Sequence, residues 1–219
     1  DTFSSRGLGD VYKRQVFTAA LAITAAASIY RIPSTKITVD DAKDADERTT
    51  LSLMDNRRQV DLHILLMMVA LGMSLMALST NLFFLIVCLE LASMASYVLV
   101  GFHKESRIGG EAGAKYFIVG SIASATGIYG MSLLYLWAGS LDFASLSASW
   151  AAMDTLDPLA GIGVGLMLVA FGFKVSAAPF HLAAPDAYSG TNAPIAGMLA
   201  TASKACLLYT SPSPRDEKV

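Results

Sequence analysis

Runs of apolar residues long enough to cross a membrane alternate along this chain with shorter polar segments. A helix needs about 20 apolar residues to cross the roughly 30 Å hydrocarbon core of a bilayer. Such runs cover residues 62–79, 82–102, 112–137 and 159–180. A final, shorter run covers residues 193–205. Residues 16–30 form a shorter, alanine-rich run. We therefore predict an all-α fold, a polytopic transmembrane helix bundle.

Composition agrees with this prediction. Hydrophobic residues make up 54% of the 219 residues and charged residues only 16%, whereas soluble domains carry about 25% charged residues. The lipid bilayer is therefore the expected environment. The net charge of −2 gives no reason to expect a nucleic-acid partner.

The polar segments between the runs differ in their basic residues. Alternating spans place the predicted loops 31–60, 103–110 and 181–192 on one side, and 79–81 and 139–157 on the other. All the lysines and arginines of these loops lie in the first group: Arg31, Lys36, Lys43, Arg48, Arg57, Arg58, Lys104 and Arg107. Basic loops stay on the cytoplasmic side, so we predict that side for the first group, in a multi-pass protein of the cell (plasma) membrane.

The two ends of the chain are related at the level of DNA. A DNA string that can encode Cys206–Asp216 has a reverse complement that encodes Ser5–Arg14. Natural gene ends have no reason to show this relation, which is typical of a translated sequencing adapter. We expect residues 1–15 and 206–219 to be non-native, and residues 16–205 to be a partial transmembrane domain.

Two charged residues fall well inside the predicted spans. Glu90 lies near the middle of residues 82–102, and Lys174 lies in the later part of residues 159–180. A charge at the centre of a membrane helix costs about 2.5–3.5 kcal/mol on insertion scales, so such residues normally have a partner and a function. The alternatives are a hydrogen-bonded packing role for the glutamate and snorkelling of the lysine to the interface.

Proline residues are expected to break the span that carries Lys174. Pro179 and Pro185 follow it, and proline lacks an amide hydrogen and clashes with the preceding helical turn. The sequence therefore predicts one discontinuous helix.

Three further residues are weaker candidates for a functional role. Lys115 follows Glu111 by four residues, a spacing that equally favours a surface ion pair. Lys204 falls inside the last predicted span, and His181 could exchange protons near neutral pH or simply be solvated. No cysteine cluster, histidine pair or phosphate loop is present in the sequence, so we expect no redox centre or cofactor in this chain.

Three stretches together carry a family resemblance. They read FLIVCLELASMASYVLVGF at 84–102, EAGAKYFIVGSIASATGIYGMSLLY at 111–135 and FGFKVSAAPFHLAAPDAYSGTNAPIAGMLATASK at 171–204. They resemble subunit N of complex I, the proton-translocating NADH:quinone oxidoreductase. The wider family includes the antiporter-like subunits L and M and the Mrp cation/proton antiporters.

The resemblance implies a fold of fourteen transmembrane helices, of which this chain would hold about helices three to eight. It implies a proton path through Glu90, Lys174, Lys115, Lys204 and His181, with Ser121 and Ser124 as possible carriers. Two positions depart from the family pattern: Ala183 stands in place of the usual tryptophan, and GTNAP in place of GAPTP.

The implied function is proton translocation in a respiratory NADH:quinone oxidoreductase, driven by redox chemistry elsewhere in the complex. The chain would be a subunit of this translocase. NADH, FMN, iron–sulfur clusters and quinone would be bound by partner subunits, and the membrane partners would include subunits L and M and small membrane subunits. A cation/proton antiporter subunit, a relative that uses F420H2 or ferredoxin, and a non-conducting membrane scaffold remain open as alternatives.

Overall fold

The computed structural model describes residues 22, 26, 45–102, 106–204 and 207. Apart from Leu207, the predicted adapter-derived ends lie outside these residues, as does most of the predicted stub at 16–30. Within the described part, the chain forms helices and no extended strand. In chain order they are α2 (Ala45–Ala77), α3 (Leu82–Val100), α4 (Arg107–Ala138), α5 (Phe143–Ala151), α6 (Pro158–Val175), α7 (Ala183–Gly190), α8 (Ala193–Met198) and the π-helix η2 (Leu199–Ser203).

Four described segments are long and apolar enough to cross a membrane, and they correspond to the four complete spans predicted from the sequence. They are Arg58–Ala77, Leu82–Val100, Arg107–Ala138 and Pro158–Val175. Many large apolar side chains on these helices face outward, including Met67, Ile122 and Leu136, each more than 60% exposed. An apolar outer face of this extent requires lipid or neighbouring protein rather than water.

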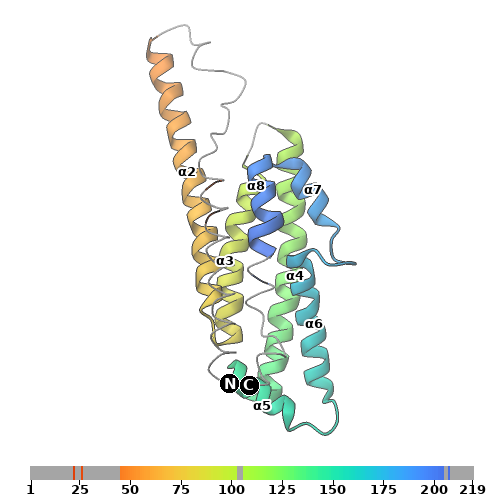
Figure 1. The fold of residues 1–219 in the computed structure, drawn as a ribbon. Helices are drawn as coiled ribbons and strands as arrows, with labels where there is room; N and C mark the ends of the chain where they lie inside the picture. Colours follow the sequence, from red (N-terminus) through yellow and green to blue (C-terminus); the bar gives the residue numbers. More distant parts are fainter. Residues whose placement is uncertain (1–21, 23–25, 27–44, 103–105, 205–206, 208–219) are drawn as a thin grey trace.

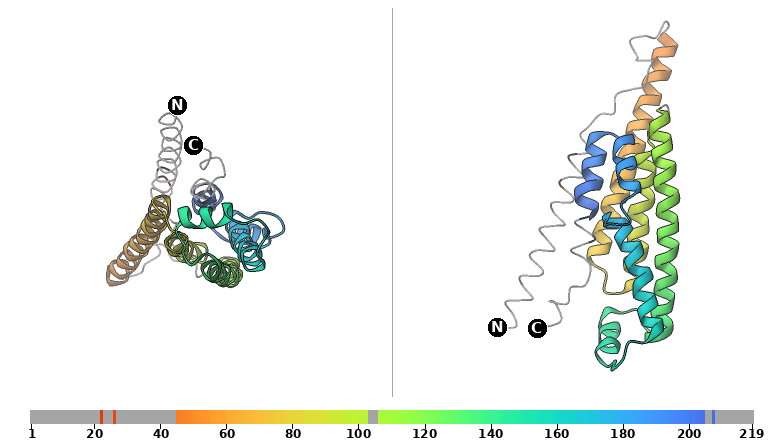
Figure 2. Two further views of the ribbon diagram at one scale, coloured as in Figure 1. Left: turned by 90° about the horizontal axis from the view of Figure 1, so that it is seen from below. Right: turned by 90° about the vertical axis from the view of Figure 1, so that its right-hand side faces the viewer.

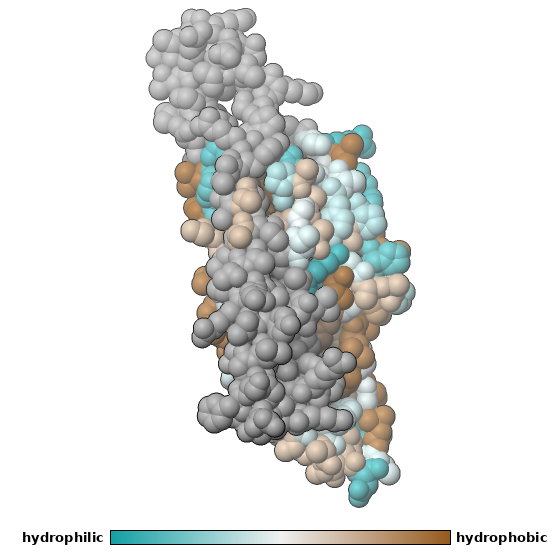
Figure 3. Space-filling view, viewed as in Figure 1, coloured by the Kyte–Doolittle hydropathy of each residue, from teal (hydrophilic) through white to brown (hydrophobic). Residues whose placement is uncertain are grey.

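The long helices run side by side (Figure 1). The closest neighbours are α4 with α6 and α2 with α3, while α3 also packs on α4. Seen end-on, α2, α3 and α4 stand in a row, and α8 lies on one side of this row (Figure 2). In the space-filling view, hydrophobic residues predominate around α6, and hydrophilic residues gather near α7 and at the opposite tip (Figure 3).

The described parts of the polar segments meet in the predicted groups at the two ends of the bundle; residues 31–44 and 103–105 lie outside the described residues. Asn81 donates a 2.7 Å hydrogen bond to Asp142, so the segments at 79–81 and 139–157 meet at one end. At the other end, α7 packs on the first turns of α4, and Arg58 lines a pocket with Gly101. The cytoplasmic assignment of that end stays a prediction.

Three segments predicted as loops are partly helical. Residues 45–60 begin α2, residues 143–151 form α5, and residues 183–190 form α7. The polar composition of 45–60 indicated a solvated loop, but glutamate, arginine, leucine and methionine are good helix formers. A polar helix can therefore extend an apolar span beyond the membrane without a change of backbone structure.

The helix break occurs earlier than the prolines suggested. Helix α6 ends at Val175, and Ser176 adopts a left-handed conformation with φ 56° and ψ 41°. The amide of Ala177 donates to the carbonyl of Gly172, and that of Ser176 to Phe173, the pattern of a Schellman ending. The prediction of one discontinuous helix is confirmed, but the break point at Pro179 was wrong, because hydrogen bonds to the last carbonyls end the helix first.

Glycines allow α4 to approach its neighbours closely. A Cβ atom at Gly130 would lie 2.7 Å from the carbonyl oxygen of Gly163. A Cβ atom at Gly127 would lie 2.6 Å from the Cβ atom of Ala170. Small residues at helix contacts are typical of membrane bundles. Close packing was predicted for Gly161, Gly163 and Gly165, but Gly165 has open space around it.

We predict that Gly130→Ala destabilises the bundle, because the added methyl group overlaps the backbone of α6. Overpacking of this kind costs about 1–3 kcal/mol. Thermal unfolding of the purified full-length subunit in detergent measures the effect. Gly165→Ala is the matched control, since its methyl group meets nothing within 4 Å. Equal melting temperatures for the two variants would contradict the predicted contact between α4 and α6.

Candidate functional site

The two charged residues predicted inside the spans form an ion pair. The Nζ atom of Lys174 on α6 lies 3.4 Å from Oε1 of Glu90 on α3. The side chain of Lys174 is 7% exposed and that of Glu90 is 22% exposed. The pair is therefore largely buried inside the bundle, and each of the two charges has the partner expected of a charge inside a membrane span.

The ending of α6 places Lys174 in the bundle. Lys174 lies in the last turn of the helix, where unpaired carbonyl groups favour a positive charge. Its side chain extends to α3 and does not snorkel toward the membrane surface. The alternative interpretation of Lys174 as an interfacial lysine is therefore wrong in this structure.

Helix α3 supplies two further partners that the sequence reasoning missed. Lys174 donates a 2.6 Å hydrogen bond to Ser93 Oγ and a 2.8 Å hydrogen bond to the Tyr97 hydroxyl oxygen. Ser93 and Tyr97 follow Glu90 by three and seven residues, so all three lie on one face of α3. This spacing from a buried glutamate could have identified them.

Helix α4 contacts the carboxylate. Ser124 donates a 2.7 Å hydrogen bond to Oε1 of Glu90, the same oxygen that faces Lys174. Ser124 and Ser121 were both predicted as possible proton carriers, and Ser124 is the one that reaches the pair. Among the described residues, no buried side-chain nitrogen or oxygen lacks a hydrogen-bond partner.

Aromatic rings surround the polar cluster. The ring of Tyr97 packs edge-on against Tyr116, with centroids 5.0 Å apart, and against Phe117 at 5.8 Å. Tyr116 in turn contacts Phe173, the residue before Lys174. These rings limit the access of water, and charges interact more strongly where water is excluded. The cluster is a small charged site in an apolar bundle.

Lys115 lies outside this cluster. Its Nζ atom is 2.8 Å from Glu111 and 3.3 Å from Asp186, and its side chain is 52% exposed. The predicted surface pair with Glu111 is confirmed, and Asp186 is a second carboxylate that the sequence reasoning missed. This contact joins the first part of α4 to α7.

Lys204 and His181 also lie apart from the buried pair. Lys204 Nζ lies 5.2 Å from the centroid of the Tyr188 ring, a distance that allows a cation–π contact. His181 is exposed in the turn that connects α6 to α7. Asp186 and Tyr188 both belong to α7. This short helix therefore carries partners of the two outer lysines, Lys115 and Lys204.

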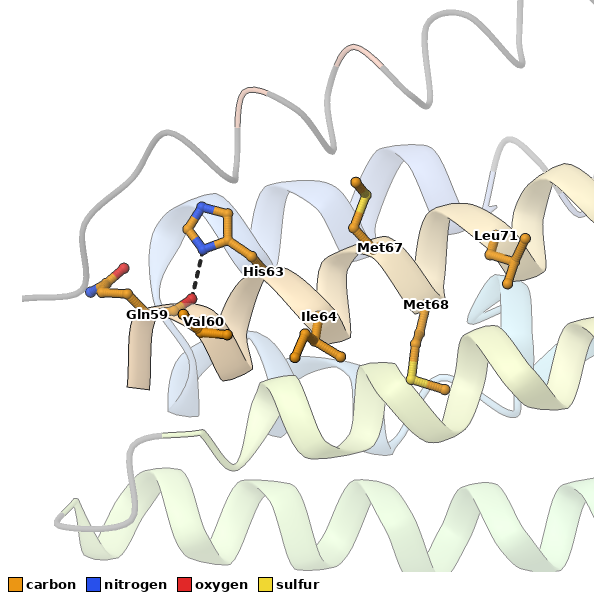
Figure 4. Close-up of a pocket in the computed structure, with 7 residues that line it drawn as sticks. All are labelled: Gln59, Val60, His63, Ile64, Met67, Met68 and Leu71. Atoms are coloured by element: carbon orange, nitrogen blue, oxygen red, sulfur yellow. Dashed lines mark hydrogen bonds between the residues drawn. The ribbon is translucent and has the colours of Figure 1, made fainter. Parts of the chain in front are cut away.

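A hollow on the outer face of α2 is a separate feature (Figure 4). It measures about 620 Å³, and its described lining residues all belong to α2: Gln59, Val60, His63, Ile64, Met67, Met68 and Leu71. The His63 ring lies 2.6 Å from the carbonyl of Gln59. No carboxylate or lysine is among these lining residues, so the hollow does not extend the buried charge pair.

Comparisons with known proteins identify relatives of this chain. Residues 79–211 match the family described as NADH:quinone oxidoreductase/Mrp antiporter, TM. The matched range passes Cys206, where the predicted adapter-derived segment begins. The chain is 42% identical over 142 residues to NADH-quinone oxidoreductase subunit N of Sphingopyxis alaskensis. It is 44% identical over 142 residues to that of Desulfitobacterium hafniense.

These alignments cover 64% of this chain and 29% and 28% of the two relatives, so the chain spans under a third of their length. Among solved structures, respiratory complex I from Thermus thermophilus with bound aureothin contains a similar chain. It gives a TM-score of 0.61 at 27% identity, over 92% of this chain and 47% of that one.

The family match covers more than half of the chain and includes Glu90, Ser124 and Lys174. It agrees with the four membrane-length helices. This chain belongs to the NADH:quinone oxidoreductase/Mrp antiporter transmembrane family.

Proposed function

We propose that this chain is part of a proton-translocating membrane subunit of a respiratory NADH:quinone oxidoreductase. The observation that carries the proposal is the buried contact between Lys174 and Glu90 at the break of α6. The relatives named NADH-quinone oxidoreductase subunit N support the choice of complex. They favour it over a cation/proton antiporter that works without a redox partner.

The buried pair has the energetics of a switch. At 3.4 Å and an effective dielectric constant near 20, two unit charges attract by about 5 kcal/mol. Loss of water from both charges opposes this attraction. If the pair separates to twice this distance, the attraction falls by about half while the lysine stays buried. Separation therefore favours release of the lysine proton, and approach favours its uptake.

The break in α6 makes such a movement feasible. Residues 176–182 are not helical, so Lys174 lies at the end of a helix instead of within a continuous one. Broken helices also line the ion sites of many transporters. His181 follows the break, and α7 then leads to Lys115 through Asp186 and to Lys204 through Tyr188. We propose His181, Lys115 and Lys204 as the outer members of the proton path.

The redox chemistry would take place elsewhere in the complex. NADH, flavin, iron–sulfur clusters and quinone would be bound by partner subunits, and the neighbouring partners would be other membrane subunits. The absence of a cofactor from this chain stays a prediction.

We predict that Lys174→Met and Glu90→Gln each abolish coupled proton translocation in the complete complex. Each variant removes one charge of the pair and keeps a side chain of similar size. The measurement is the number of protons moved per electron in proteoliposomes that contain the purified complex.

Asp154→Asn is the control for loss of a charge, because Asp154 is exposed at the end of the bundle that carries α5. It should translocate protons as the wild type does. A normal proton-to-electron ratio in both Lys174→Met and Glu90→Gln would rule out the proposed role of the pair.

A further prediction concerns the exposed ion pair of α4. Glu111→Gln should change the free energy of unfolding by less than about 1 kcal/mol, because exposed ion pairs contribute little. Lys115→Met should reduce proton translocation, but less than Lys174→Met does. Thermal unfolding tests the first expectation and the proteoliposome assay the second. An unchanged proton-to-electron ratio in Lys115→Met would remove this lysine from the path.

A further inference from the structure

The ammonium group of Lys174 lies closer to two neutral hydroxyl oxygens than to the carboxylate. Its Nζ atom is 2.6 Å from Ser93 Oγ and 2.8 Å from the Tyr97 hydroxyl, against 3.4 Å to Glu90. A lysine ammonium has three hydrogens to donate. The two hydroxyls and the carboxylate therefore provide one acceptor for each of these three hydrogens. The two shorter contacts, to the hydroxyls, do not depend on the charge of Glu90.

The Ser93 hydroxyl has a fixed orientation. Its own hydrogen is donated to the carbonyl oxygen of Leu89 at 2.6 Å, so its oxygen faces Lys174 only as an acceptor. Ser96 makes the same kind of contact one turn further on, with the carbonyl of Ala92. The two serines therefore share their helix, their burial and their backbone contact. They differ in that Ser93 also accepts a hydrogen bond from Lys174.

The Tyr97 ring is held by α4. A Cβ atom at Gly120 would collide with the hydroxyl oxygen and the adjacent ring carbons of Tyr97. The rings of Tyr116 and Phe117 pack against it from the same helix. With only 4% of Tyr97 exposed, its hydroxyl has a defined position. Unlike Ser93, a tyrosine hydroxyl can either accept from an ammonium or donate to a neutral amine.

We infer that Ser93 and Tyr97 are positioning residues that keep the ammonium group of Lys174 against α3 while its ion pair with Glu90 changes. This inference rests on the proposed function. When Glu90 is neutral or has moved away, the hydroxyls still hold the lysine head group in the bundle. When Lys174 is neutral, the Tyr97 hydroxyl donates to it. The lysine head group therefore keeps its place in the path in both of its protonation states.

The test uses the complete complex in proteoliposomes, with the rate of proton translocation during NADH oxidation as the readout. Ser93→Ala and Tyr97→Phe should each lower the translocation rate by about tenfold, the effect of losing one hydrogen bond to a charged group. Ser93→Thr keeps the hydroxyl and should restore most of the rate. Ser96→Ala and Tyr116→Phe are matched controls that leave the contacts of Lys174 unchanged.

The outcomes separate this inference from the proposed function. If Lys174→Met abolishes translocation while Ser93→Ala and Tyr97→Phe translocate at the wild-type rate, the inference is wrong and the proposed function stands. If Lys174→Met and Glu90→Gln both translocate normally, the proposed role of the pair is itself wrong. If Tyr97→Phe reduces the amount of assembled complex, the Ser93 series decides. A Ser93→Ala rate equal to that of Ser96→Ala would then overturn the inference.

Discussion

The arrangement of this bundle depends on the need to satisfy one lysine ammonium inside an apolar environment. A buried charge without partners would cost several kcal/mol, so the helices around Lys174 must bring polar groups to it. Helix α3 provides a carboxylate and two hydroxyls on one face, and α4 provides a serine to the carboxylate. Three helices are thereby fixed relative to one another at the level of the charge pair.

Close packing makes these contacts possible. Gly120 leaves room for the Tyr97 ring, and Gly127 and Gly130 let α4 approach α6. Without such approach the lysine could not reach α3, since its side chain has a fixed length. Packing and electrostatics therefore depend on each other here. The small residues bring the helices together, and the polar cluster determines which faces meet.

The short helix α7 connects the interior of the bundle to its edge. It follows the break that places Lys174, and it carries the contacts of Lys115 and Lys204. A movement at the break could therefore reach both outer lysines. The position of α7 against the start of α4 also depends on a glycine, because a Cβ atom at Gly190 would collide with Ala112.

The sequence by itself determined the four membrane-length helices, the discontinuous helix and the two buried charges, because apolar length and a charge inside it are local properties. It also determined Lys115 with Glu111, which are neighbours on one helix. Only the tertiary structure decided that Ser93, Tyr97 and Ser124 surround the pair, and that Asp186 and Tyr188 meet the outer lysines. These contacts join residues far apart in the chain, and their geometry depends on how α3, α4, α6 and α7 pack. The break at Ser176 likewise depended on backbone hydrogen bonds, which the prolines downstream did not reveal.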